Sequence, residues 1–183
     1  ATFNLQNYKL KIYMNGTSTV FTFTFPSYNL PAGESVVITN IDNSSTDQQW
    51  SDYTLIQPTH VFHGETSTIR GNGNDAYELL DGSNNVIDVY GEQTVNGTGQ
   101  PWEYTDSYAY RNLNITSPNT TFSISEWTIA APNTLDGQSD DLSPYCTPGY
   151  RVLSSENDIL TFTIPEETGP ATIDATNHRV DIE

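Results

Sequence analysis

The sequence predicts an all-β protein, a sandwich of about seven to nine short strands, and three observations support this fold class. Apolar and polar side chains alternate over residues 8–13, and Phe alternates with Thr over residues 20–25, a pattern typical of half-buried strands. Residues 75–80 and 86–90 are two apolar runs separated by the turn-forming sequence Asp-Gly-Ser-Asn-Asn. No stretch of the chain requires a long helix.

The first two strands are expected to form a hairpin. The alternation over residues 8–13 is followed by Asn15-Gly16, which is the strongest short hairpin signal. The partner strand, residues 20–25, ends at Pro26 and places three rings on one face: Phe21, Phe23 and Phe25. Facing a core, these rings bury several kcal/mol of apolar surface, at ~25 cal/mol per Å².

The hairpin of residues 75–90 is expected to be apolar on both faces and therefore central in the sandwich. Gly and Asn in its loop, residues 81–85, are expected to supply the positive φ of a tight turn. One face is assigned Tyr77, Leu79, Ile87 and Val89, and the other Ala76, Leu80, Val86 and Tyr90. In the preceding loop, residues 71–75, the glycines indicate that the backbone passes close to another segment.

Shorter strands are predicted at residues 35–39, 61–63, 68–70 and 122–127. Residues 40–59 are polar and are predicted to form a loop with one helical turn over residues 48–53. A single core is expected, made of Tyr8, Leu10, Ile12, Phe21, Phe23, Phe25, Val36, Ile38, Leu79, Ile87, Val89 and Trp127.

Several segments together resemble a known family. The sequence GNGNDAYELLDGSNNVIDVYG resembles the signature hairpin of lamin tail domains, in the version found in secreted bacterial proteins. The resemblance extends to FNLQNYKLKIYMNG and LPAGESVVI upstream, and to WEYTDSYAYR and FSISEWT downstream, and so covers residues 3–150. It implies an immunoglobulin-like β-sandwich with no catalytic apparatus of its own.

The end of the chain is predicted to belong to another domain. Residues 1–153 form the expected sandwich, residues 154–158 a linker, and residues 159–183 the truncated start of a second β domain. The segment after residue 158 resembles the opening of small β-sandwich repeats of bacterial surface proteins, with a strand at 159–164 and a hairpin of 171–173 with 179–182. Alternatively, residues 159–164 complete the first sandwich, because lamin tail domains begin with a strand that has no equivalent before residue 4.

Composition narrows the classes of function. The chain has 23 Asp and Glu against 6 Lys and Arg, a net charge of −17. Such a charge disfavours nucleic acid and anionic membrane surfaces, and no apolar run approaches the ~20 residues of a membrane span. Cys146 stands alone, so no internal disulfide forms. An acidic, cysteine-poor chain rich in Asn, Thr and Tyr favours an extracellular or cell-surface location.

Calcium is the one cofactor that the sequence suggests. Asp136, Asp140 and Asp141 lie in a loop rich in oxygen donors, and Ca²⁺ takes six to eight such oxygens. The spacing is not that of an EF-hand. The alternative, which Asp composition alone favours, is a solvated surface turn.

Aromatic residues provide a second candidate site. Trp50, Tyr53 and Trp102 could form a platform for sugars or peptide side chains if their rings are exposed. Core packing is the alternative for Trp102 and Trp127, because both match positions of the lamin tail family. Trp50 has no such equivalent.

Other polar groups receive structural interpretations. Asn74 and Asp75 are expected to bond backbone N–H groups of their own loop, and Glu78, Glu103 and Glu126 to lie on solvated strand faces. His60 and His63 are a weak zinc pair, since structural zinc sites take four ligands and only Cys146 and His178 remain.

The sequence thus predicts a non-catalytic binding or spacer module of a secreted or cell-surface multidomain bacterial protein. A carbohydrate-binding accessory domain and a passenger domain of a secreted hydrolase or nuclease are the alternatives. The expected partners are neighbouring domains of the same polypeptide and a protein or glycan ligand, and the chain is expected to be a monomer.

Overall fold

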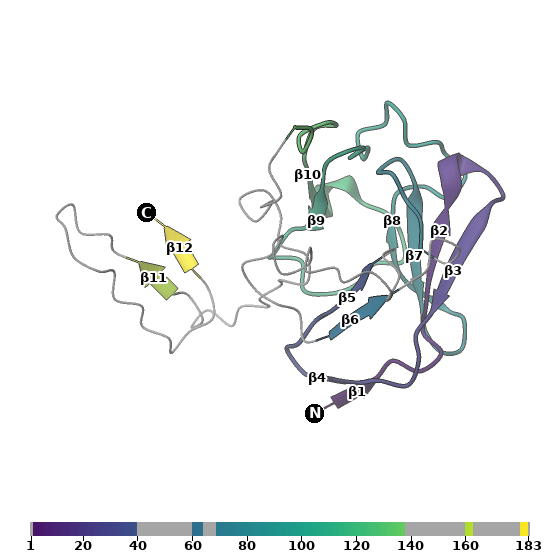
Figure 1. Cartoon of the computed structure of the whole chain (residues 1–183), viewed down its shortest axis with the longest axis vertical. Helices are drawn as coiled ribbons and strands as arrows, with labels where there is room; N and C mark the ends of the chain where they lie inside the picture. Colours follow the sequence, from purple (N-terminus) through teal and green to yellow (C-terminus); the bar gives the residue numbers. More distant parts are fainter. Residues whose placement is uncertain (1, 40–59, 64–68, 138–159, 163–179, 183) are drawn as a thin grey trace. The chain divides into compact units, whose positions relative to one another are not determined.

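The structure is a computed structural model that describes residues 2–39, 60–63, 69–137, 160–162 and 180–182. It is nearly all β, as predicted, with two short 3-10 helices, Met14–Gly16 and Ile124–Glu126 (Figure 1). The chain divides into two compact units, Ala1–Tyr150 and Arg151–Glu183. Within the described ranges, no helix has the length and apolar character needed to cross a membrane.

A four-stranded antiparallel sheet is the largest element. It contains β3 (Val20–Thr24), β2 (Lys9–Tyr13), β7 (Ala76–Leu80) and β8 (Val86–Tyr90), in the order β3-β2-β7-β8 (Figure 1). Both predicted hairpins are confirmed. Asn15 and Gly16 have φ of 52° and 68°, as the β2–β3 turn requires. In the β7–β8 turn, however, Asn84 has a positive φ of 68° and Gly82 does not.

Three strand pairs accompany this sheet in the first unit. β1 (Thr2–Asn4) pairs antiparallel with β4 (Asn29–Pro31), and β9 (Ala109–Arg111) pairs antiparallel with β10 (Trp127–Ile129). The third pair, β5 (Val36–Thr39) with β6 (His60–His63), is parallel. A hairpin turn cannot join two parallel strands, so β5 and β6 are joined by a crossover connection.

The predicted faces of the β7–β8 hairpin are wrong at β8. Tyr90 pairs with Tyr77, Asp88 with Leu79 and Val86 with Leu80, which leaves Ile87 as an extra residue at an irregularity beside Leu79/Leu80. One extra residue reverses the side-chain alternation beyond it. Tyr90 therefore lies on the same face as Tyr77, whereas Val89 is opposite Glu78 on the other face.

The main core lies between the four-stranded sheet and the β5–β6 pair. Its buried centre is Leu5, Phe25 and Phe62, and the Phe25 and Phe62 rings meet edge to face at 5.5 Å. Around it pack partly buried residues from the sheet, the β5–β6 pair, β4 and the adjoining connections: Tyr8, Leu10, Phe23, Tyr28, Leu30, Val36, Ile38 and Leu79. Most of these were predicted as core, and Ile12 is fully buried as well.

The prediction of one core is wrong in one respect, because Trp127 belongs to a second cluster. Its ring lies 4.7 Å from that of Tyr90, beyond the edge strand β8. The strand predicted at residues 122–127 begins only at Trp127, after the 3-10 helix of residues 124–126. The strand predicted at residues 68–70 is not formed by Ile69 and Arg70, its two described residues. The helical turn predicted at residues 48–53 lies outside the described residues.

In the second unit, β11 (Leu160–Phe162) pairs with β12 (Val180–Ile182). The pairing is parallel, with Leu160 opposite Val180. Among the described residues, the partner of the tail strand is therefore in the tail itself. Residues 171–173, predicted to pair with 179–182, lie outside the described part.

Candidate functional site

Trp102 is a core residue, so its predicted role in a ligand platform is corrected. It is 3% exposed, and its backbone oxygen accepts a hydrogen bond from the Tyr90 hydroxyl at 2.6 Å. A Cβ at Gly97 would lie 2.5 Å from the Trp102 ring, so glycine is needed there to let the ring in. Trp50 and Tyr53, the other two platform candidates, lie outside the described residues.

The loop before β7 is held by polar side chains, and the predicted bond to a backbone N–H of the same loop is confirmed for Asp75 but not for Asn74. Asp75 is fully buried, and its carboxylate accepts hydrogen bonds from the backbone N–H groups of Asn15 and Asn72 at 2.8 and 3.1 Å. Asn74 donates to the Thr98 hydroxyl at 2.9 Å. These groups therefore join the loop to the β2–β3 turn and to residues 97–98.

Glu78 is buried, contrary to the prediction of a solvated face. It is 5% exposed and accepts hydrogen bonds from the hydroxyl of Tyr13, at 2.5 Å, and from the amide of Gln93. Burial raises the pKa of Tyr13 to about 12, together with the hydrogen bond to Glu78 and its negative charge. The carboxylate is thus committed to a structural bond.

Glu126 belongs to an ion-pair network around the buried Arg111 and is only 18% exposed, contrary to the prediction of a solvated face. Arg111 donates two hydrogen bonds to Asp88, at 2.8 and 2.7 Å, and its guanidinium lies 3.5 Å from Glu126. Asn119 donates to Glu126 at 2.8 Å. The network connects β8, β9 and the 3-10 helix that precedes β10.

Glu103 and His60 have local structural contacts. The Glu103 carboxylate accepts hydrogen bonds from the Gly99 backbone and the Thr105 hydroxyl, at 2.7 and 2.9 Å. The His60 ring stacks on Tyr28 at 4.6 Å. The other half of the weak zinc pair, the His63 side chain, is outside the described part.

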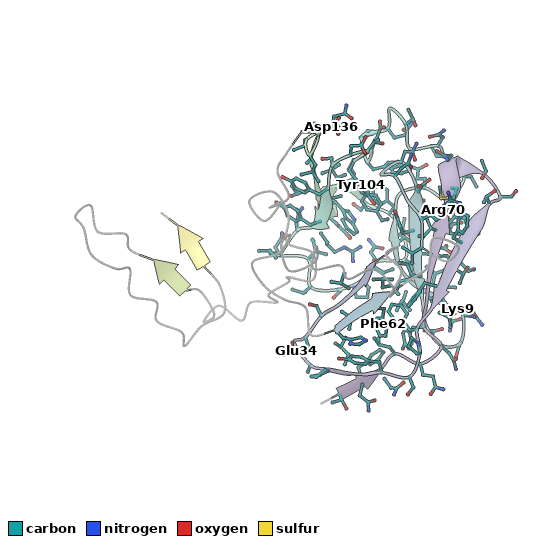
Figure 2. The ribbon with its side chains drawn as sticks, in the orientation of Figure 1. Lys9, Glu34, Phe62, Arg70, Tyr104 and Asp136 are labelled. Atoms are coloured by element: carbon teal, nitrogen blue, oxygen red, sulfur yellow. The ribbon has the colours of Figure 1, made fainter. Side chains whose placement is uncertain are left out.

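The candidate site is a cavity of about 390 Å³, here called the Gly73 pocket. Its wall is made of Gly71, Asn72, Gly73, Tyr104, Asp106, Ser107, Leu135 and Asp136. Figure 2 shows Tyr104 inside the fold and Asp136 at its periphery, on the loop that follows β10.

Backbone hydrogen bonds assemble the Gly73 pocket from three segments of the chain. The N–H of Tyr104 donates to the oxygen of Gly73 at 2.8 Å, and the N–H of Leu135 to that of Asp106 at 3.0 Å. Gly73 has a φ of 91°, and a Cβ there would lie 2.4 Å from the Thr105 nitrogen. The glycine therefore permits the close approach that was predicted for this loop.

Three polar groups of the Gly73 pocket are uncommitted, unlike the carboxylates of the interior. In the described part of the chain, the carboxylates of Asp106 and Asp136 have no hydrogen-bond or ion-pair partner, and the Ser107 hydroxyl oxygen is buried without one. The phenol of Tyr104 bonds Tyr77 at 3.3 Å, and burial is the main cause that raises its pKa well above the ordinary value.

The pocket contains one predicted calcium ligand, Asp136. Asp140 and Asp141 lie beyond the described residues, and within these no cluster of three or more His, Cys, Asp or Glu is suited to a metal. Sequence reasoning missed Asp106 and Ser107. The sequence Thr105-Asp106-Ser107 signals a turn, but nothing local indicates that this turn meets Gly73.

No family model matches the chain, and searches of curated proteins and of solved structures returned no match. The function is therefore inferred from the site itself. Fold and site define an all-β module in which the interior carboxylates support structure and the uncommitted polar groups line an open pocket.

Proposed function

We propose that this chain is a non-catalytic binding module of a secreted or cell-surface multidomain bacterial protein. Its resemblance to lamin tail domains supports the extracellular setting and the absence of catalysis, as does its acidic, cysteine-poor composition. The partners in this proposal are neighbouring domains of the same polypeptide and an external ligand, bound by a monomer.

One observation carries the non-catalytic part: the interior carboxylates are tied to structural partners. Asp75 holds backbone N–H groups, Glu78 holds Tyr13, and Asp88 with Glu126 flanks Arg111. A general acid or a nucleophile must instead be free to reach a substrate. The carboxylates that are free, Asp106 and Asp136, are both exposed to solvent.

Activity assays test this proposal directly. The purified chain is incubated with polysaccharides, nucleic acids and phosphate esters, and we expect no turnover. Hydrolysis that survives repurification and disappears on a single Asp or Glu substitution would contradict it. The passenger-domain alternative predicts the same result for this chain and differs only in what the rest of the polypeptide does.

The second candidate function, carbohydrate binding, is favoured by the Gly73 pocket rather than by the platform predicted from sequence. Trp102 is buried, but the pocket places the free carboxylates of Asp106 and Asp136 beside Leu135. Carboxylates accept hydrogen bonds from the hydroxyl groups of a sugar.

We further propose that Asp136, with Asp140 and Asp141, forms at most one weak calcium site. A ligand that binds only the folded chain raises its melting temperature. We expect millimolar calcium to do so, and Asp136→Asn to remove the effect. An unchanged melting curve would mean that these residues form a plain surface turn.

A further inference from the structure

We propose that the outer edge of β3 binds an extended, uncharged segment of a partner protein, which adds to the four-stranded sheet as a further strand. β3 is the edge strand on one side of this sheet, next to β2 (Figure 1). The inference rests on the proposed binding function and deepens it, because it names the kind of ligand and the strand that takes it. Addition of a strand to an open sheet edge is a recurring mode of peptide recognition.

The hydrogen bonds of the β2–β3 hairpin show which backbone groups of β3 face outward. The N–H of Phe25, directly after the strand, donates to the oxygen of Tyr8 at 2.9 Å. Because the direction of these groups alternates along a strand, the backbone groups of Phe23 and Phe21 also point at β2. The remaining groups point away from β2: the N–H and C=O of Val20, Thr22 and Thr24.

The outward side of β3 is open to solvent. Val20 and Thr24 are exposed, and Val20 retains 39% of its accessible surface. In the described part of the chain, no strand pairs with this side of β3, and no backbone group donates to it or accepts from it. A row of backbone groups without partners is a template for another strand.

β3 lacks the features that usually protect an edge strand from pairing, namely charged side chains, proline and β-bulges. Residues 20–24 contain no charge and no proline, and their pairing with β2 runs without a shift in register. The other edge strand, β8, has such protection. It carries Asp88, which is bound to Arg111 of β9, and an irregularity interrupts its pairing with β7. The difference makes β3 the edge of this sheet at which a partner strand can add.

The side chains of β3 set the composition of the segment that fits. Phe21 and Phe23 share one face of the strand and are half-buried, so an added strand would place alternate side chains beside these two rings. Aromatic and β-branched side chains pair favourably with aromatic rings across strands. The segment therefore carries aromatic or β-branched residues at every second position.

Charge distinguishes a foreign segment from a second copy of this chain. The first acidic residue of the sequence is Glu34, and the only charged side chains before it are those of Lys9 and Lys11. The hairpin thus has no carboxylate that would repel a partner strand. The whole chain nevertheless has a net charge of −17, and so large a charge of one sign opposes self-association. The partner is therefore a protein that is not itself acidic.

Hydrogen exchange of the full chain tests this proposal with a synthetic peptide of alternating valine and threonine, flanked by paired lysines for solubility. In the free chain, the N–H groups of Val20, Thr22 and Thr24 should exchange fast, and those of Phe21 and Phe23 slowly. We expect the peptide to slow exchange at the first three. The control peptide has the same side chains and charge but is N-methylated at every residue, so it cannot donate and should leave exchange unchanged.

Calorimetry with two variants measures the contribution of the edge to peptide affinity. Thr22→Pro removes the central outward N–H, which forms no bond within the sheet, and should weaken binding about tenfold or more, the effect of losing one or two hydrogen bonds. Thr22→Val keeps this N–H and is the matched control, which should bind normally. Hydrogen exchange of the unaltered chain does not depend on the folding of either variant.

The outcomes separate this inference from the proposed function. Absence of peptide binding at millimolar concentration, or equal binding of both peptides, would overturn the β3 site. Slow exchange of the three outward amides without peptide, together with a sedimentation coefficient that rises with protein concentration, would assign the edge to a second copy and also overturn the proposal. Peptide binding at β3 by a chain that hydrolyses one of the assayed substrates would support the edge site but refute the non-catalytic function.

Discussion

The guanidinium of Arg111 on β9 and the carboxylate of Asp88 on β8 form two parallel hydrogen bonds, at 2.8 and 2.7 Å. Arg111 is 9% exposed, and its guanidinium carbon lies 4.7 Å from the centre of the Trp127 ring. Asp88 also accepts the N–H of Asn119 at 3.1 Å. The pair therefore joins the edge of the four-stranded sheet to the separate β9–β10 pair.

Arg111→Met should destabilise the fold by about 3 kcal/mol, the lower end of the cost of breaking a buried pair. It leaves the carboxylates of Asp88 and Glu126, whose side chains are 26% and 18% exposed, without their cation. Urea unfolding measures the loss. The matched control is Arg70→Met, which removes an exposed guanidinium 5.3 Å from the Phe21 ring and should cost at most about 1 kcal/mol. Equal losses in the two variants would mean that the buried network adds nothing.

Asp75→Asn should cost about 1.5–3 kcal/mol, the range for hydrogen bonds to a charged group. The carboxylate now accepts one hydrogen bond on each oxygen. In the variant, the amide NH₂ group would face one of these backbone N–H donors, and that bond would be lost. Asp106→Asn makes the same chemical change at an exposed residue and should remain within about 0.5 kcal/mol of the parent. Thermal unfolding compares them, and a stable Asp75→Asn variant would show that the loop does not need this charge.

Phe25→Ala should cost about 3–5 kcal/mol because its ring is buried at the centre of the main core. Phe23→Ala, at a half-buried ring in the same hairpin, should cost less. Both rings follow the same strand alternation, so a difference in stability between the two variants reports the difference in their burial. A larger loss for Phe23→Ala than for Phe25→Ala would contradict the position of Phe25 at the centre of the main core.

Alkaline pH should destabilise the protein through its tyrosines. The folded-state pKa of Tyr13 is raised to about 12, and those of Tyr77 and Tyr104 are also raised, with burial as the first cause in each. A raised pKa means that the fold favours the protonated phenol. This contribution is complete below the ordinary value of about 10 and is lost as pH rises through the folded-state pKa.

Absorbance of the phenolate during a pH titration measures this effect. Glu78→Gln should lower the pKa of Tyr13 toward its ordinary value, because it removes the negative charge beside the phenol. Tyr13→Phe should remove one late-titrating group. A titration in which all tyrosines ionise together near the ordinary pKa would contradict the described burial.

Sequence reasoning succeeded where the signal is local. Asn15-Gly16 set the β2–β3 hairpin, and the alternating Phe residues placed Phe23 and Phe25 at the core. It failed where the position of a residue depends on how distant strands pair. The face of Tyr90 depends on the extra residue at Ile87, and the parallel pairing of β5 with β6 depends on a distant strand.

The sequence by itself determined the all-β class, the two hairpins and the structural role of Asp75, because side-chain alternation, turn residues and Asp chemistry act over a few neighbouring positions. Only the tertiary structure decided that Glu78 is buried and Glu126 is paired with Arg111, that Trp102 is core, and that Asp106 and Ser107 share a pocket with Gly73. Burial and proximity arise when segments distant in sequence pack together. No local pattern encodes which of them will meet.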